Sequence, residues 1–318
     1  MAAIAVRPLQ DDLAFGARIT GATYETLKDE AIRKQINAVF EDRGLIVFED
    51  VEPSGQMHLA ISDVFGPLKD HPVPSVQRVD QDTMPGVIDM QTKPDAGSIV
   101  EINGRLLASW LPWHFDHCYN NELNRAGVLR AIEIAPEGGL TGFADGIALY
   151  NDFSPALRAR IEDRKVLYTV NTSYEDMRFG KPKQFRDVRE NPSQGAVKEF
   201  SKTLPRAVHP AVWTRKTGEK VLHVSPWMAV GLEGAEDAEG DALLEAVSQE
   251  IQVKVRPYHH RWKTTEMLIW DNWRMLHSVS GMDPKYGRRM QRTTIKGDYG
   301  LGYFENGGVG HAILEMTV

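Results

Sequence analysis

The chain has little cysteine, no excess of basic residues and no long apolar run, and each absence excludes a class of protein. One cysteine, Cys118, in 318 residues rules out an internal disulfide and a cysteine-based zinc site. The net charge of −7, from 37 Lys and Arg against 44 Asp and Glu, argues against a nucleic-acid-binding protein, which needs a basic face. No stretch reaches the roughly 18 consecutive apolar residues of a membrane-spanning helix.

The remaining composition is that of an ordinary globular protein. Apolar residues make up 42% of the chain and charged residues 25%, which is enough for a sizeable core. The N-terminus, MAAIAVRPLQDD, becomes charged too early for a secretory signal, so we expect a cytoplasmic protein. No repeat, low-complexity run or Gly/Ser linker divides the chain. We therefore expect one domain over residues 1–318, and a homo-oligomer stays open.

The N-terminal part has helical spacing around one strand. Residues 25–43 place apolar side chains at helical intervals among charges, which predicts an amphipathic helix. Residues 44–48 form a short apolar run typical of a buried strand. Residues 54–66 predict a second helix, with Ser54 as its N-cap and Gly66 as its stop.

After about residue 67, prolines and glycines recur and the apolar runs shorten. Two helices are predicted here, Ser154–Glu162 and Asp241–Glu250, each with its first residue as N-cap. Too few helices separate the strands for regular βαβ units, which favours an antiparallel sandwich or barrel with helices packed outside it. The predicted strands are Val128–Ile134, Val166–Val170, Val221–Val224, Ile251–Val255, Met267–Trp270 and Arg292–Lys296.

The most informative segment is Trp113-His114-Phe115-Asp116-His117. On an extended strand, His114 and Asp116 would point to the same face while Phe115 points to the other. A nitrogen donor and an oxygen donor on one face supply two ligands of a 2-His-1-carboxylate metal site. His117 is a rival ligand.

A distant histidine has to complete such a site, and His277 is the natural candidate. It follows the strand-like run Met267–Trp270 and a turn-like Asp-Asn pair. Three ligands on one face of an octahedral Fe(II) leave three positions open, two for a 2-oxo acid and one for dioxygen. A structural zinc site would instead be closed by four protein ligands.

Two arginines follow His277 at distances of 11 and 15 residues. Arg288 and Arg292 are four residues apart, so on a strand both side chains would face the same side. A guanidinium matches a carboxylate in a two-point contact and stays charged at any working pH. One arginine suits the far end of a dicarboxylate cosubstrate and the other suits a substrate anion. An internal ion pair with a distant Asp or Glu remains the alternative for Arg292.

In order and spacing, these motifs resemble those of the taurine dioxygenase/phenoxyacetate dioxygenase (TauD/TfdA) family of Fe(II)- and 2-oxoglutarate-dependent oxygenases. The similarity runs from about residue 15 to about residue 300. It implies a mainly β fold with flanking helices around a double-stranded β-helix, or jelly-roll, core. The matching motifs are Phe65–Leu68, His71-Pro72-Val73, Trp113–Asp116, Gly138–Thr141, Trp270–Asn272, His277 and Arg288–Asp298.

The resemblance also implies the cofactor residues. It assigns Fe(II) to His114, Asp116 and His277, and the distal carboxylate of 2-oxoglutarate to Arg288, helped by the hydroxyl of Thr141. From the residues alone, Thr141 would be an ordinary turn threonine.

For the substrate, the resemblance implies that His71 and Arg292 hold an anionic group. Trp110 stands where the taurine enzyme has an asparagine, which argues against taurine and for a more apolar or aromatic substrate. Trp270 resembles the family's aromatic residue near the metal. The polar segment 171–206 predicts a mobile cover near the active-site mouth, because its composition suits neither strand nor core.

The resulting functional expectation is a dioxygenase that uses Fe(II), 2-oxoglutarate and dioxygen to oxidise a small anionic molecule, most simply by hydroxylation. The same chemistry could end in desaturation, cyclisation or another rearrangement. From a different class, a non-catalytic jelly-roll protein that binds a metal or an anion stays open. We expect no nucleic-acid or membrane partner.

Overall fold

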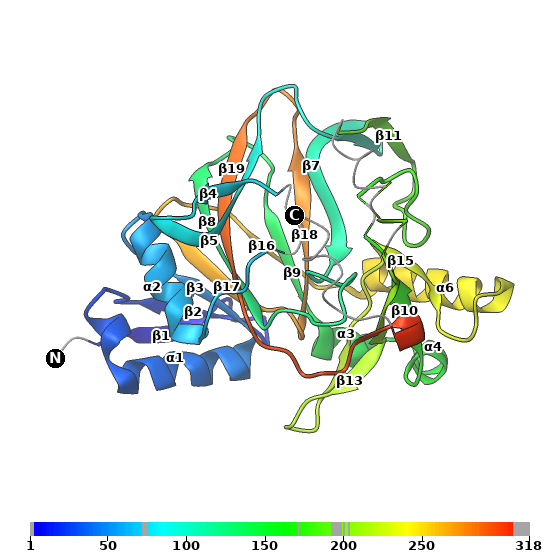
Figure 1. Ribbon diagram of the computed structural model, residues 1–318, viewed down its shortest axis with the longest axis horizontal. Coiled ribbons are helices and arrows are strands. Elements are labelled where there is room, and N and C mark those ends of the chain that lie inside the picture. The colour runs from blue at the N-terminus through cyan, green and yellow to red at the C-terminus, as the bar shows by residue number, and fades with distance from the viewer. Residues whose placement is uncertain are drawn as a thin grey trace.

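A computed structural model describes most of the chain: residues 3–71, 76–170, 172–191, 199, 201–202 and 204–307. Two β-sheets occupy the middle of the molecule, with α1 and α2 at one end and α3, α4 and α6 at the other (Figure 1). In the described part, strand pairs are antiparallel except β2 with β3. This agrees with the predicted mainly β architecture with flanking helices.

The larger sheet has eight strands and contains both arginines of the predicted site. Its order is β1 (Ala5–Pro8), β2 (Ala17–Thr20), β3 (Leu45–Phe48), β17 (Met267–Asp271), β8 (Ala126–Glu133), β19 (Arg288–Ile295), β5 (Met84–Thr92) and β4 (Arg78–Asp80).

The second sheet has six strands and contains the histidines of the predicted metal site. Its order is β11 (Phe185–Arg189), β6 (Ile99–Ile102), β7 (Arg105–His114), β18 (Met275–Met282), β9 (Thr141–Asp145) and β16 (Tyr258–His260). Smaller sheets are formed by β15 (Ala229–Leu232), β10 (Lys165–Tyr168), β12 (Ala207–Pro210) and β20 (Tyr303–Phe304), and by β13 (Val212–Thr214) with β14 (Lys220–Leu222).

The helices pack on the outside of the sheets. Side chains of α1 and α2 share one apolar cluster with the larger sheet, and those of α6 share another with β10 and β14. Among the described residues, no helix is both long and apolar enough to cross a membrane. The helices are α1 (Glu30–Arg43), α2 (Gly55–Phe65), α3 (Gly146–Asp152), α4 (Pro155–Ile161) and α6 (Ala238–Lys254), with 3₁₀ turns at Thr26–Lys28 and Glu305–Gly307.

Local capping explains the first two helices. The Asp29 carboxylate accepts hydrogen bonds from the first turn of α1, and Gly44 ends that helix with φ = 70°, which a glycine adopts without steric cost. The Ser54 hydroxyl caps α2 by accepting from the amide of Met57, as predicted.

Two predictions near α6 are wrong. Asp237, not Asp241, caps this helix, and the predicted strand Ile251–Val255 is its last turn and C-cap. Apolar side chains recur along α6 at helical spacing and are buried. Packing of this face outweighs the preference of Ile251 and Val253 for strands. The buried apolar side chains are Leu243, Leu244, Val247 and Ile251.

The segment 171–206 also differs from the prediction that it suits neither strand nor core. Residues Phe185–Arg189 form β11, which pairs with β6 at the edge of the six-stranded sheet. Tyr174, Met177 and Phe179 are buried. Residues 171, 192–198, 200 and 203 lie outside the described residues, as do Pro72 and Val73 of a predicted motif.

Candidate iron centre

Three buried side chains from distant parts of the chain converge between the two large sheets. The ligand atoms of His114, Asp116 and His277 all lie within 4.8 Å of one another. The antiparallel register of β7 and β18 places His277 directly opposite His114, with ring centroids 4.1 Å apart. The Nε2 atom of His277 lies 3.6 Å from Oδ1 of Asp116. His277, which the sequence predicted as the distant third ligand, therefore completes the group.

The route by which Asp116 reaches this group differs from the prediction. Strand β7 ends at His114, so Asp116 lies in the following turn and not on the strand. Phe115 does point away, as predicted, and stacks on the ring of His223 at 3.8 Å. Burial of this aromatic ring in the core anchors the turn between the two ligands.

Asn272 holds the same turn from the neighbouring β17–β18 connection. Its Oδ1 accepts a hydrogen bond from the Asp116 amide at 2.8 Å, and its Nδ2 donates to the Asp116 carbonyl at 3.0 Å. Nδ2 also lies 3.0 Å from Oδ1 of Asn124. Sequence reasoning placed Asn272 only in a motif. The signal was a fully polar amide directly after a buried strand, where such a group needs partners.

His114 is in the form that binds metals. Nδ1 of His114 donates to the carbonyl of Pro112 at 2.8 Å, which leaves Nε2 as the metal-facing atom. Burial, assisted by nearby His277, lowers the pKa of His114 to about 3, so its imidazole is neutral at pH 7. Trp270 lies 4.9 Å from the ring of His277, as the family resemblance implied.

Arg292 forms an ion pair with Asp116. Its Nη1 lies 2.8 Å from each carboxylate oxygen, and both side chains are about one-tenth exposed. Burial by itself would raise the pKa of Asp116, but Arg292 and then His277 hold that pKa well below its usual range. The internal ion pair that the sequence left open as the alternative for Arg292 is therefore present, with Asp116, a carboxylate far away in the sequence, as its partner. Among the described residues, Nε of Arg292 has no hydrogen-bond partner.

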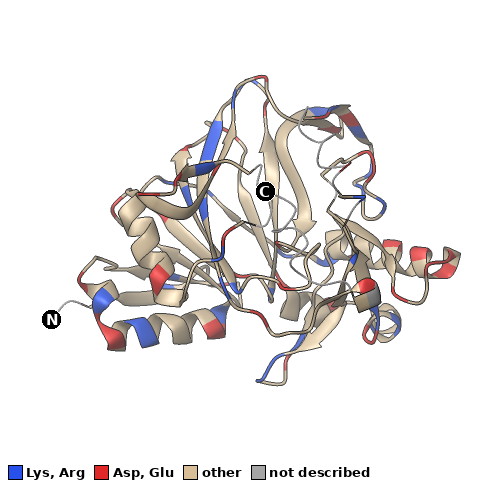
Figure 2. Ribbon diagram, in the orientation of Figure 1, with Lys and Arg blue, Asp and Glu red and all other residues tan. Residues whose placement is uncertain are grey.

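Arg288 faces the same side of β19 and lies against the six-stranded sheet (basic residues along β19 are blue in Figure 2). Its Nε donates to the Gly139 carbonyl at 3.1 Å, and its Nη2 lies 3.4 Å from the hydroxyl of Thr141. Nε1 of Trp262 donates to the same hydroxyl at 3.1 Å. Burial lowers the pKa of Arg288 to about 10, so the guanidinium remains charged at pH 7. Arg288 borders a cavity of about 370 Å³.

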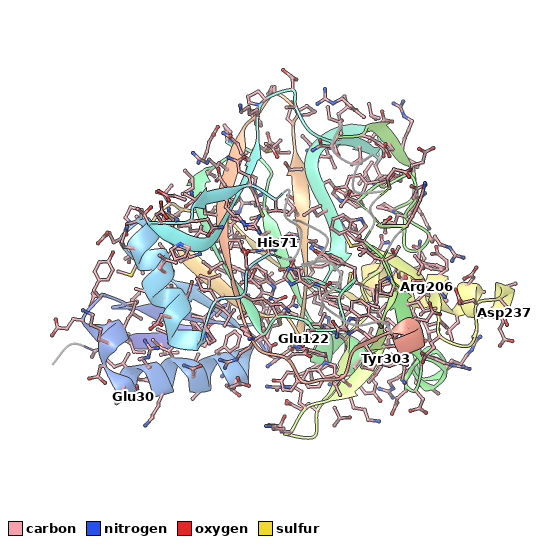
Figure 3. The ribbon with its side chains drawn as sticks, in the orientation of Figure 1. Glu30, His71, Glu122, Arg206, Asp237 and Tyr303 are labelled. Atoms are coloured by element: carbon pink, nitrogen blue, oxygen red, sulfur yellow. The ribbon has the colours of Figure 1, made fainter. Side chains whose placement is uncertain are left out.

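The three predicted substrate residues lie at different distances from the metal group. Arg292 contacts Asp116 directly, and the ring of His71 lies 5.3 Å from that of His117, next to Asp116 in the chain. Figure 3 shows His71 near the centre of the molecule in this view. Trp110 lies farther out.

A chain of aromatic rings connects Trp110 with the metal group. Its ring centroid is 5.3 Å from that of Tyr174, which is 6.1 Å from that of Trp227. Trp227 in turn lies 5.1 Å from His114. Sequence reasoning missed Trp227, because a lone tryptophan after Ser-Pro carries no signal that distinguishes it from a core residue.

The donor set fits Fe(II). Two imidazoles and one carboxylate on one side of a site are the facial triad of non-haem iron oxygenases, which leaves open positions for a cosubstrate. The convergent group contains His114, Asp116 and His277, and His117, the rival ligand, lies beside it.

Comparison with known proteins places the chain in the same chemistry. Residues 5–294 match the family described as Taurine catabolism dioxygenase TauD, TfdA family. The chain is 27% identical over 292 residues to the (S)-phenoxypropionate/alpha-ketoglutarate-dioxygenase of Sphingobium herbicidovorans, covering 90% of this chain and 93% of that one. It is 23% identical over 270 residues to the alpha-ketoglutarate-dependent 2,4-dichlorophenoxyacetate dioxygenase of Cupriavidus pinatubonensis, covering 83% and 88% of the two chains.

The fold has close counterparts among solved structures. The crystal structure of AAD-2 in complex with Mn(II) and N-oxalylglycine superposes with a TM-score of 0.68 at 21% identity, covering 93% of this chain and 98% of that one. This agreement confirms the predicted jelly-roll core. With the family match over most of its length, the chain belongs to the TauD/TfdA family and is an Fe(II)- and 2-oxoglutarate-dependent dioxygenase.

Proposed function

We propose that this enzyme oxidises, most simply hydroxylates, a small organic anion with an apolar or aromatic body, and releases succinate and CO2. The observation that carries the substrate class is Arg292. Its guanidinium is buried beside the metal group, and its Nε has no partner among the described residues. An arginine has five N–H donors, so Arg292 can hold Asp116 through Nη1 and still bind a second anion.

We assign Fe(II) to His114, Asp116 and His277. Iron held by these residues would supply the activation of dioxygen, with 2-oxoglutarate as the source of electrons. The protein orients the ligands: the Pro112 carbonyl fixes the ring of His114, and Arg292 with Asn272 fixes Asp116. The surrounding aromatic rings exclude water from the site.

We assign the distal carboxylate of 2-oxoglutarate to Arg288. Its Nη2 is close to the hydroxyl of Thr141, so both groups can donate to one carboxylate. Trp262 also donates to the Thr141 hydroxyl, which fixes that oxygen as acceptor there and leaves its own proton for the cosubstrate.

The aromatic body of the substrate is supported by the rings around the site and by the relatives, whose names specify phenoxypropionate and dichlorophenoxyacetate. His71 lies close enough to Asp116, through His117, to serve the anionic end as proposed. Trp110 is assigned to the outer wall of the site, where it supports Tyr174.

A screen for succinate tests this function. The purified protein is mixed with Fe(II), ascorbate and 2-oxoglutarate, and succinate is measured with and without aryloxy acids, aliphatic carboxylates and alkyl sulfates. We expect at least one aryloxy acid to raise succinate formation, and mass spectrometry to find the one added oxygen either in the hydroxylated acid or, where the carbon next to the ether oxygen is hydroxylated, in the phenol and 2-oxo acid into which that product breaks down. Binding of metal and anion without succinate formation by any compound would favour the non-catalytic alternative. A product that has lost two hydrogens would favour desaturation or cyclisation.

A further inference from the structure

His117 is a buried histidine with unused hydrogen-bonding capacity. Only 3% of its surface is exposed, and neither Nδ1 nor Nε2 has a hydrogen-bond partner among the described residues. Buried polar atoms are nearly always paired, because an unmade hydrogen bond leaves the cost of desolvation uncompensated. A core position that served packing alone would be better filled by an apolar ring.

The backbone at His117 is held in an unusual conformation. Its φ of 60° lies in the left-handed region, which residues other than glycine seldom adopt. The neighbouring residues hold it there: Asn272 brackets Asp116 on one side, and the Asn120 amide donates to the His117 carbonyl at 2.8 Å on the other. Strain of this kind persists where the surrounding structure imposes it, and it concentrates at functional sites.

The surroundings of His117 are those of an anion site. Its ring lies 5.3 Å from the ring of His71 and 6.1 Å from that of Tyr119. Arg292 and Lys69 are near enough for their positive charges to act on it, and the carboxylate of Asp116 is the negative group beside it. Arg292 pairs with Asp116 through Nη1, and its Nε, which has no partner among the described residues, remains to donate to a further anion.

We propose that His117 is a substrate-binding residue that donates an N–H hydrogen bond to the anionic group held by Arg292. This inference rests on the proposed function and specifies the site of that anion. An imidazole has at least one N–H in either protonation state, so the donor is always present. Arg292 and His117 together match an oxyanion with two or more oxygens, such as a carboxylate or a sulfate ester, and discriminate against a neutral analogue.

Binding measurements test the role of His117 separately from turnover. The protein is loaded with Mn(II) and N-oxalylglycine, which replaces the cosubstrate, and calorimetry measures the Kd of phenoxyacetate, hexyl sulfate and neutral phenoxyethanol. His117→Phe keeps the ring shape and removes the donor. We expect this variant to bind the anionic probe with an affinity roughly 10- to 100-fold lower than that of wild type. This is the usual effect of losing a hydrogen bond to a charged group. The probe compared is the one that wild type binds best. Phenoxyethanol binding should be unchanged.

Two further variants control for folding and geometry. His117→Asn tolerates the left-handed backbone and keeps an N–H donor, so it should retain more affinity than the Phe variant. His117→Gly relieves the backbone strain and deletes the ring, and it carries the same test if the Phe variant does not fold. His259→Phe, on an exposed position of β16, is the matched histidine control and should bind like wild type.

The outcomes separate this inference from the proposed function. If wild type binds an anionic probe and His117→Phe binds it equally well, His117 is not a substrate residue and the proposed function stands. A loss of Mn(II) or N-oxalylglycine affinity in His117→Phe, with probe affinity retained, would also overturn the inference and make His117 a support of the metal group. If wild type binds neither anion, the anionic substrate class and this inference fall together.

Discussion

Arg292 donates through one nitrogen to both carboxylate oxygens of Asp116, at 2.8 Å each. A cation of the larger sheet therefore keeps ionised and oriented the carboxylate, in the turn after β7, that we assign to the metal. The same guanidinium is the one assigned to the substrate anion. The pair thus connects the metal group to the substrate site through a single side chain.

Loss of a metal ligand should abolish turnover. Asp116→Ala, His114→Ala and His277→Ala should each end substrate-dependent succinate formation. Asp116→Ala should also lower the free energy of unfolding of the metal-free protein by about 3 kcal/mol, because it leaves Arg292 buried without its partner. Urea denaturation and a succinate assay measure the two effects. Normal hydroxylation by the Asp116 variant would show that the triad assignment is wrong.

Removal of Arg292 should affect substrate and metal but not the cosubstrate. Arg292→Gln should weaken the binding of the anionic substrate, while the Kd of 2-oxoglutarate stays near normal. Since Arg292 lowers the pKa of Asp116, that pKa should rise in the variant, and Mn(II) binding should be lost at a higher pH than in wild type. Metal titrations between pH 4 and 7 check this. Lost 2-oxoglutarate binding with unchanged substrate preference would instead place Arg292 in the cosubstrate site.

Arg288 should dominate cosubstrate affinity. Arg288→Ala should raise the Kd of 2-oxoglutarate by one to two decades, since a charge-assisted pair contributes roughly 1.5–3 kcal/mol. Thr141→Val removes one neutral hydrogen bond and should cost about 1 kcal/mol, or roughly fivefold. Anaerobic titration of the Fe(II) protein with 2-oxoglutarate measures both constants. Equal affinity in wild type and Arg288→Ala would contradict the assignment.

Acid should destabilise the protein well above the pKa of most carboxyls. Burial lowers the pKa of several histidines from 6.5, to about 3 for His58, His223 and His260 and to about 4 for His209. Below about pH 6.5 these histidines are therefore protonated in the unfolded chain, whereas in the folded chain they stay neutral down to pH 3 to 4. Stability falls through that window by up to roughly 1.4 kcal/mol per pH unit for each histidine.

One buried carboxyl opposes this trend. Burial raises the pKa of Asp271 to about 6, so its protonation below pH 6 favours the folded state. This offsets the loss of stability that about one of the histidines causes. Urea unfolding at pH 7, 6 and 5 should still show a falling free energy. His223→Phe, which removes one such group, should flatten the slope, and a pH-independent free energy in wild type would contradict the account.

The described part of segment 171–206 should become protected when the site is filled. Tyr174 donates to the Trp110 carbonyl and its ring faces Trp227, which contacts His114, so the described part of this segment packs on the aromatic rings next to the metal group. We propose that it is the cover of the active site. Limited proteolysis with and without Mn(II), N-oxalylglycine and an aryloxy acid should show slower cleavage within the segment on binding. An unchanged cleavage pattern would count against the cover.

The sequence by itself determined the chemistry of this protein. Residue types and spacing indicated His114 and Asp116 as candidate metal donors, because the two are two apart and their convergence needs only a local change of direction. The resemblance to the family assigned Fe(II) to them and to His277. The shared orientation of Arg288 and Arg292 on β19 was predictable for a similar local reason, since alternation along a strand puts both side chains on one face. Helix caps such as Ser54 also depend only on neighbouring residues.

Tertiary structure alone decided which groups meet across the sheets. The partner of Arg292 is Asp116 because two sheets face each other, a contact that no local pattern encodes. Ile251 is helical because it belongs to the buried apolar face of α6, although isoleucine itself prefers strands. The positions of Asn272 and His117 were decided in the same way. Asn272 hydrogen-bonds to the backbone of a turn that is distant in the sequence, and His117 is buried beside the metal group with its nitrogens unpaired among the described residues. Long-range packing determines burial, and burial determines which polar groups need a partner.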